Sequence, residues 1–275
     1  MHDLTCLRCG KSFTHKRKRE YCGRQCANVD RNDILKSKRN NIPRKTVWSC
    51  GGGVQSTAIA VLICQGKLPI PDYAVMIDCG YEKSQTWEYV HNTIVPNLKE
   101  HGVELNILKT NDWSDNNLFD KQNHIRLPLF INNNGKQVKF DTHCNQTWKV
   151  MVIKRWMRSK GIEACEGWLG ISSDERRRAR SSPNDWYSYR YPLLDMGLDR
   201  EDCIYLIAAA GWSRPHHTSC FCCPNQKDRQ WQDMKEAYPI DWQRAIEVEK
   251  QIQSVMPNAY LHRSMVPLHE VELKC

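Results

Sequence analysis

The chain has 275 residues, of which 40% are hydrophobic and 26% are charged, and its formal net charge is +9. This length predicts one main domain with a small additional module, and it excludes a peptide too short to bury a core. Because no apolar run approaches the roughly 20 residues of a membrane-spanning helix, we expect no membrane partner.

Cysteine is the most informative residue type, with 14 copies. The N-terminus does not have the pattern of a secretory signal, so we expect a reducing compartment, the cytoplasm. There, cysteines act as metal ligands or catalytic groups rather than as disulfides. Cys64, Cys165 and Cys203 fall in helix- or strand-like runs and are expected to be buried thiols.

Residues 1–30 contain two cysteine pairs, Cys6/Cys9 and Cys22/Cys26, separated by 12 residues. This spacing is typical of a tetrahedral four-cysteine zinc site, without which so short a fragment would not stay folded. The module resembles the small zinc knuckles attached to nucleic-acid enzymes, although such knuckles also act as structural clips. The basic run 16–19 lies between the pairs and should be exposed on the module.

The positive charge is concentrated at the N-terminus. Residues 1–45 hold 13 Lys/Arg and 4 Asp/Glu, a net of +9, which leaves 27 residues of each sign in the remainder. This asymmetry favours contact with a phosphate backbone and predicts a nucleic-acid partner; the alternative is a solvated charge run without a ligand. Residues 31–44 are predicted to form a basic linker or short helix, and 45–275 the main domain.

A glycine-rich stretch, 49–56, lies between a strand-like run, 45–48, and an apolar helical run, 57–62. Three glycines allow a tight turn whose N–H groups point at one anion, and the helix N-terminus adds partial positive charge. The spacing fits neither a Walker loop nor a dinucleotide-binding turn. We therefore predict a phosphate-binding loop.

Strand and helix patterns alternate after this loop. Strands are expected at 72–78 and 103–108, with an amphipathic helix at 84–100 between them, which predicts right-handed βαβ units and a parallel sheet. Asp78 and Glu82 follow the first of these strands, at the sheet edge where ligands bind. Residues 111–140 lack periodicity and are expected to form a mobile loop or a hairpin over the site.

Two later stretches contain further candidate residues. A strand ending at Gly170 precedes Asp174, Glu175 and Arg178, a set able to hold Mg²⁺ or a phosphate, although a solvated helix start is the alternative. Beyond it, a Cys-x-x-Cys-Pro motif combines with a distant cysteine before a basic helix at 148–160. The proposed ligands of this iron–sulfur or zinc centre are Cys144, Cys220 and Cys223, with Cys222 as a further candidate.

These motifs together resemble a known superfamily. The loop is similar to that of the PP-loop ATP pyrophosphatases, and more closely to the Ser-x-Gly-Gly-Gly-x-Gln-Ser loop of the phosphoadenosine phosphosulfate (PAPS) reductase-like family. The likeness spans roughly 45–273 and includes an Asp-x-Gly-x-Glu segment at 78–82 and a Gly-Ile-x-x-Asp-Glu-x-x-Arg segment at 170–178. Gln55 replaces the usual loop acid, and Cys79 departs from the family pattern.

The resemblance implies an open parallel α/β sheet of adenine-nucleotide alpha-hydrolase type that uses ATP and Mg²⁺. Asp78, Asp174, Glu175 and Arg178 would then be catalytic. The implied nucleotide-binding residues are Ser49, Gly51, Gly52, Gly53, Gln55, Ser56, Asp78 and Glu82. The three cysteines resemble those that hold a [4Fe–4S] cluster, with one iron open, in sulfur-inserting relatives.

The expected function is therefore ATP-dependent adenylylation of a nucleic acid followed by sulfur insertion, either DNA phosphorothioation or tRNA thiolation, with a sulfur donor protein as an additional partner. One alternative is a PAPS or adenylyl sulfate reductase, which is disfavoured because the Glu-Cys-Gly-Leu-His tail of reductases is absent. Another is a DNA-binding module regulated by nucleotide.

Overall fold

The structure, a computed structural model, describes residues 2–7, 9–23, 26–27, 43–182 and 185–274. Most of the predicted basic linker, residues 31–42, lies outside the described residues. The predicted boundary between the N-terminal module and the main domain therefore stays a prediction.

A five-stranded sheet forms the centre of the main domain, and every neighbouring pair of its strands is parallel. The strand order is β5-β4-β3-β8-β9. The strands are β3 (Lys45–Cys50), β4 (Tyr73–Asp78), β5 (Leu105–Lys109), β8 (Cys165–Trp168) and β9 (Tyr187–Arg190). The predicted open parallel α/β sheet is confirmed, whereas β9 is an addition that the sequence patterns did not predict.

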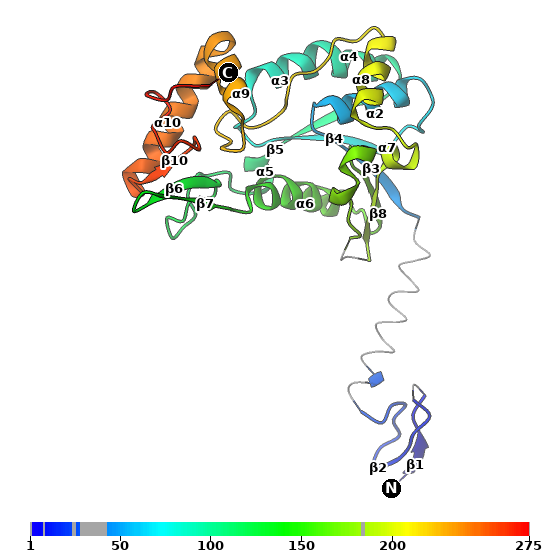
Figure 1. The fold of residues 1–275 in the computed structure, drawn as a ribbon. Coiled ribbons are helices and arrows are strands. Elements are labelled where there is room, and N and C mark those ends of the chain that lie inside the picture. Colours follow the sequence, from blue (N-terminus) through cyan, green and yellow to red (C-terminus); the bar gives the residue numbers. More distant parts are fainter. Residues whose placement is uncertain (1, 8, 24–25, 28–42, 183–184, 275) are drawn as a thin grey trace.

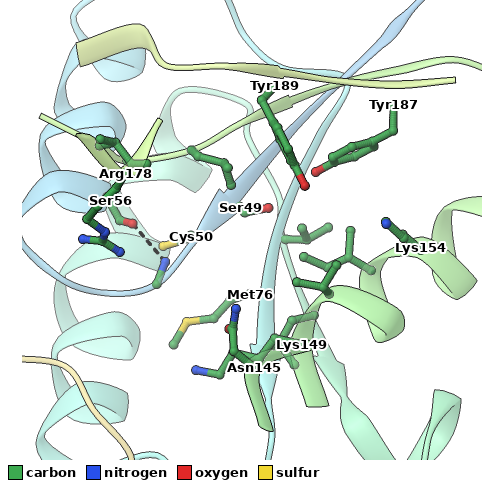
Figure 2. Close-up of a pocket in the computed structure, with 18 of the residues that line it drawn as sticks. Ser49, Cys50, Ser56, Met76, Asn145, Lys149, Lys154, Arg178, Tyr187 and Tyr189 are labelled. Atoms are coloured by element: carbon green, nitrogen blue, oxygen red, sulfur yellow. Dashed lines mark hydrogen bonds between the residues drawn. The ribbon is translucent and has the colours of Figure 1, made fainter. Parts of the chain in front are cut away.

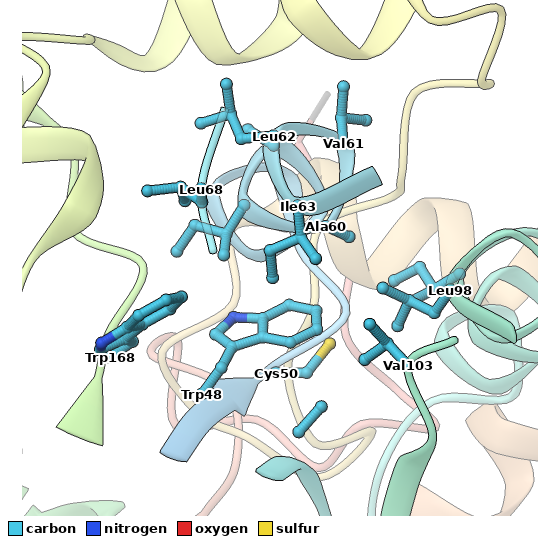
Figure 3. Packing of buried hydrophobic residues seen from close by; sticks show 14 of the residues in the cluster. Trp48, Cys50, Ala60, Val61, Leu62, Ile63, Leu68, Leu98, Val103 and Trp168 are labelled. Carbon is cyan, nitrogen blue, oxygen red and sulfur yellow. The ribbon is translucent and has the colours of Figure 1, made fainter. Parts of the chain in front are cut away.

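Helix α2 (Val54–Cys64) covers one face of this sheet and is mostly apolar, with nine of its 11 residues buried. Such a helix is stable only when surrounded. Trp48 and Trp168, both fully buried, extend from the sheet toward it (Figure 3). The rest of this layer is α8 (Arg200–Ala209) and the predicted 84–100 helix, which consists of α3 (Ser84–Tyr89), π-helical η1 (Val90–Ile94) and α4 (Val95–Glu100).

Helix α6 (Met151–Ser159) covers the opposite face. Its buried residues Val152, Trp156 and Met157 pack against apolar side chains of the sheet such as Val47 and Val75. The π-helical segment η2 (Gln146–Val150) leads into it. The main domain is thus a three-layer α/β arrangement (Figure 1).

A second apolar core lies under the C-terminal helices, where the rings of Trp231 and Trp242 meet edge to face at 6.2 Å. Its elements are α9 (Asp228–Ala237), α10 (Pro239–Val255) and the strands β6 (Leu129–Asn133) and β10 (Ala259–Tyr260). The exposed strand β7 (Lys136–Phe140) pairs with β6 on the side opposite β10, and both pairings are antiparallel. The alternative of a hairpin within 111–140 is therefore right for the β6–β7 part of that stretch.

The N-terminal module contains one antiparallel pair, β1 (His2–Thr5) and β2 (Ser12–His15). The short elements of the main domain are α5 (Thr110–Trp113), the 3₁₀ segment η3 (Ser173–Arg178) and α7 (Pro192–Asp195). Among the residues that the structure describes, no helix combines the length and the apolar character that a membrane crossing requires.

Candidate active site and metal centres

The candidate active site lies at the carboxyl end of the central strand, β3. In the sheet, β4 and then β5 lie on one side of β3, whereas β8, which comes later in the sequence, lies on its other side. The connections that follow β3 and β8 therefore diverge, and such a reversal of strand order leaves a crevice where ligands bind in open parallel sheets. Residues of both connections line two cavities at this point.

The glycine-rich loop after β3 has the geometry of an anion-binding turn. Gly52 has a φ of +71°, and a Cβ there would lie 3.0 Å from Cγ2 of Thr86. The Gly51 N–H donates to Ser56 Oγ at 2.9 Å, and Gly53 caps the N-terminus of α2. Ser49 Oγ is buried and has no hydrogen-bond partner in the structure. The loop thus offers an unpaired hydroxyl and a helix N-terminus, a donor set that fits a phosphate.

A cavity of about 450 Å³ opens beside this loop (Figure 2). Ser49 and Ser56 line it from the loop side, Tyr187 and Tyr189 from β9, and Lys149 from η2. Its wall combines apolar and polar surface, which suits a nucleoside with its first phosphate. We call this the loop cavity.

A second cavity of about 430 Å³, the polar cavity, lies on the other side of the same loop. Gln55 connects two opposite charges there: its amide oxygen accepts from Arg200 at 3.3 Å, and its amide nitrogen donates to Glu175 at 3.4 Å. Arg178 pairs with Glu175 at 2.7 Å and lines both cavities. A neutral amide suits this position because an acid here would face the Glu175 carboxylate.

Two of the predicted catalytic acids satisfy backbone groups and line neither cavity. Asp78 accepts from the N–H of Gly80 at 2.8 Å, and Asp174 accepts from the N–H of Arg200 at 3.1 Å. The Ser172 hydroxyl, together with backbone bonds, lowers the pKa of Asp174. Both acids thus stabilise loops around the site, whereas Glu82, Glu175 and Arg178 line the cavities themselves.

The internal cysteines surround one buried region beside the loop cavity. Cys220 and Cys223 belong to one turn, in which the Cys223 N–H donates to the Cys220 carbonyl at 3.1 Å. Cys222 is fully buried, and Cys144 packs against the same core. The structure adds Cys79, whose Sγ lies 3.8 Å from that of Cys220. Such a set of thiols has the donor chemistry of an iron–sulfur or zinc centre.

Lys149 connects the loop cavity to this region because its ammonium group contacts the buried carboxylate of Glu82. The carboxylate lies 3.7 Å from Cys79 Sγ. Burial opposes the charge on Lys149, but Glu82 and the nearby sulfurs outweigh this effect and raise its pKa. A positive charge is therefore retained between the cavity and the thiols.

The pKa values of the thiols shift in opposite directions. A hydrogen bond from Cys220 lowers the pKa of Cys79, and the same bond, together with burial, raises the pKa of Cys220. Burial raises the pKa of Cys222 and, despite nearby lysines, that of Cys223. Of the Cys79–Cys220 pair, Cys79 is thus the more acidic thiol, and the first thiolate forms more readily than the second.

Sequence patterns alone miss several residues of these sites. They present Cys79 only as a departure from a motif, although Cys79-x-x-Glu82 has the spacing of a ligand pair. Arg200 and His216, which line the polar cavity, belong to no recognised motif. Only the fold brings these two residues to the loop.

The four N-terminal cysteines converge as predicted, with their sulfur atoms all within 4.8 Å of one another. Cys22 Sγ lies 3.7 Å from the sulfurs of both Cys9 and Cys26, and Gly10 adopts a φ of +69° in the turn of the first pair. This donor set fits a tetrahedral zinc ion. The basic residues 16–19 are exposed on the module, as expected.

Comparisons with known proteins give a structural likeness but no sequence match. No family model and no curated protein sequence matches the chain. Among solved structures, the chain is similar to the U34-tRNA thiolase NcsA from Methanococcus maripaludis with its [4Fe–4S] cluster, at 16% sequence identity and a TM-score of 0.43. The alignment covers 100% of this chain and 91% of the thiolase. At this level the likeness carries no argument about activity, so the site itself has to support the function.

Proposed function

We propose that this chain is an ATP-dependent enzyme that adenylylates a nucleic-acid acceptor and then inserts sulfur into it. One observation carries the proposal: the loop cavity has Ser49 and Ser56 of the glycine-rich loop on one wall and Glu82 and Lys149, which adjoin the thiols, on another. A nucleotide in this cavity would have its α-phosphate between a phosphate loop and a sulfur-bearing region.

The proposed reaction has two steps. An acceptor oxygen attacks the α-phosphorus of ATP, the α–β phosphoanhydride bond breaks, and pyrophosphate leaves. A hydrosulfide equivalent, delivered from a sulfur donor, then attacks the acceptor centre, and AMP leaves with the former acceptor oxygen. No net oxidation or reduction occurs when the sulfur arrives as hydrosulfide.

The residues have separate roles in this scheme. The glycine loop and Arg178 hold the phosphates, and positive charge from Arg178 and Lys149 offsets the charge that accumulates as pyrophosphate leaves. Glu175, beside the loop, would hold Mg²⁺. A [4Fe–4S] cluster with one open iron, when bound by Cys144, Cys220 and Cys223, would supply a carrier for the sulfur.

The acceptor is proposed to be nucleic acid because the positive excess is confined to residues 1–45. Both DNA and tRNA carry the phosphate charge that would attract this segment, and the cytoplasm provides ATP, tRNA and a reducing environment for the thiols.

Pyrophosphate release provides the test. Anaerobically purified protein is incubated with ATP, Mg²⁺, sulfide and either tRNA or DNA, and the digested nucleic acid is examined by mass spectrometry for thio-nucleosides or phosphorothioate links. We expect pyrophosphate release that depends on one nucleic acid and is lost in Ser56→Ala but retained in Ser254→Ala, an exposed serine on α10. Sulfite release from adenylyl sulfate with a thiol reductant, without pyrophosphate, would replace this proposal with the reductase alternative.

A further inference from the structure

Three potential ligand side chains meet beside the loop cavity. The ligand atoms of Cys79, Glu82 and Cys220 all lie within 4.8 Å of one another. Cys79 is fully buried, and the Glu82 side chain is 4% exposed. Buried thiol and carboxylate groups this close to one another normally require either protons or a cation between them.

The spacing of these atoms matches a single metal ion. Zinc binds thiolate sulfur at about 2.3 Å, and the edge of a tetrahedron with that radius is about 3.8 Å. The two sulfurs of Cys79 and Cys220 are 3.8 Å apart, and Glu82 Oε1 is 3.7 Å from Cys79 Sγ. The N-terminal four-cysteine module shows the same spacing, 3.7 Å, between neighbouring sulfurs.

Backbone contacts hold the three ligands in place. Glu82 and Cys220 form an antiparallel β-bridge, and the N–H of Phe221 donates to the Tyr81 carbonyl at 2.8 Å. Asn116 donates to the Cys79 carbonyl at 2.9 Å. The ligands come from segments 141 residues apart in sequence, yet they are fixed relative to each other. An ion would therefore bind with little rearrangement.

The surrounding charge also suits a bound ion. Two thiolates and one carboxylate around a divalent cation leave one net negative charge. Lys149 contacts Glu82, whereas burial lowers the pKa of Lys83 despite the opposing effect of the Cys223 and Cys220 sulfurs. Lys149 thus offsets the net negative charge of a loaded site.

We propose that Cys79, Glu82 and Cys220 bind one thiophilic divalent cation of the zinc class, with a fourth coordination position left for a ligand from the loop cavity. Three protein ligands with one open position are typical of catalytic rather than structural zinc sites. The proposal deepens the proposed function, on which it rests only for the chemistry that the ion would serve. It assigns Cys79 and Glu82, in place of Cys144 and Cys223, as partners of Cys220, and the open position of this ion would then replace the cluster iron as the sulfur carrier of the proposed reaction.

Metal content of the full-length chain tests this assignment. Zinc and iron are counted after anaerobic purification, and the zinc is then exchanged for Co²⁺, whose thiolate charge-transfer absorption reports sulfur ligands. We expect two ions per chain in wild type, and one in Cys79→Ser and in Cys220→Ser. Two ions should remain in Cys144→Ser, in Cys223→Ser and in the matched control Cys64→Ser, a half-buried thiol at the end of α2.

Glu82→Gln keeps the shape of the side chain and covers the case in which Cys79→Ser does not fold. This substitution should lower the affinity of the Cys79/Glu82/Cys220 site for Co²⁺ by at least about tenfold. The Co²⁺ bound by the N-terminal module serves as an internal reference. Unchanged affinity in Glu82→Gln overturns the site. So does a set of roughly four irons per chain that is lost in Cys144→Ser and Cys223→Ser but retained in Cys79→Ser.

Failure of the site and failure of the proposed function are distinguishable. Two cobalt ions without any pyrophosphate release from ATP leave the metal site standing and overturn the enzymatic proposal. Pyrophosphate release from a chain that binds only the N-terminal ion would support the enzymatic proposal and overturn the metal site.

Discussion

Backbone geometry at single residues decides whether the glycine-rich loop can form. Gly52 has a φ of +71° and approaches Thr86 so closely that a Cβ would lie 3.0 Å from Cγ2. Any other residue at this position encounters both left-handed strain and a steric contact. The glycine-rich loop therefore depends on the left-handed backbone conformation of Gly52 as much as on its polar groups.

Gly52→Ala should destabilise the protein by about 1–2 kcal/mol through left-handed strain and should also abolish ATP binding. Gly66→Ala is the matched control, because Gly66 has a φ of +66° but has free space around its Cα. Both variants are compared by urea unfolding and by calorimetric titration with ATP. Equal ATP affinity in the two variants would contradict the role of the loop.

Asp72 gives stability that depends on pH. Burial opposes its charge, but Lys45 and Thr46 donate to its carboxylate at 2.7–2.9 Å, and the net effect lowers its pKa. A lowered carboxyl pKa in the folded state stabilises the protein above the unfolded pKa. This stability is lost as the pH falls below about 4 and through the folded value.

Because this ion pair is exposed to solvent, Asp72→Asn should lower the free energy of unfolding by about 0.5–1 kcal/mol at pH 7, and the difference from wild type should shrink below pH 4. Urea unfolding across pH 3–7 measures this, with Asp112→Asn, an exposed aspartate on α5, as the control. A difference that stays constant over the whole range would show that the charge of Asp72 is not involved.

At the level of elements, a long-range cap joins the C-terminal helices to the sheet domain. Asp241 on α10 is fully buried and accepts from the backbone N–H of Ser84 at 2.6 Å and from its hydroxyl at 3.0 Å. Ser84 begins α3, which follows the loop that holds Cys79 and Glu82. This contact thus connects α10 to the start of α3, two residues after Glu82.

Asp241→Asn should destabilise the protein by about 1–3 kcal/mol, because the buried N–H of Ser84 loses a charged acceptor. Asp233→Asn, an exposed aspartate on α9, is the control and should have little effect. Thermal unfolding measures the difference, and a double-mutant cycle with Ser84→Ala should show coupling. If the two substitutions change the free energy of unfolding additively, Asp241 acts through groups other than the Ser84 hydroxyl.

The elements also show how far sequence patterns predict this protein. Alternating strand and helix runs predict β3, α2, β4 and β5, because a buried parallel strand and an apolar helix both leave long hydrophobic stretches. Strand β9 is missed because its four residues, Tyr187–Arg190, are too short to show a period. Cys79 is missed because its nearest sulfur, that of Cys220, comes 141 residues later.

At the scale of the whole molecule, charge is divided between a basic N-terminal segment, residues 1–45, and a neutral main domain. Residues 16–19 are exposed and basic, whereas acidic and basic residues balance over 46–275. Electrostatic attraction to nucleic acid should therefore come from this N-terminal segment, to which residues 16–19 contribute.

Replacing Lys16, Arg17, Lys18 and Arg19 by alanine should weaken binding of tRNA or DNA. It should also reduce the slope of log K against log salt by about 0.9 for each B-DNA phosphate that the variant no longer neutralises. The matched control replaces four exposed lysines of the main domain, Lys67, Lys121, Lys136 and Lys139. Fluorescence anisotropy over a salt series measures both sets, and equal slopes would place the nucleic-acid interface elsewhere.

Because β3 lies in the middle of the sheet, its two neighbouring strands become available for pairing at different times during synthesis. Arg44, just before β3, donates to the Cys165 carbonyl of β8 across 121 residues. At ribosomal rates of 5–20 residues per second, β8 follows β3 by about 6–24 s. Throughout that interval one edge of β3 has no strand to pair with, and the crevice between β3 and β8 does not yet exist. A chain interrupted before β8 therefore exposes an aggregation-prone sheet edge and is not a smaller version of the folded domain.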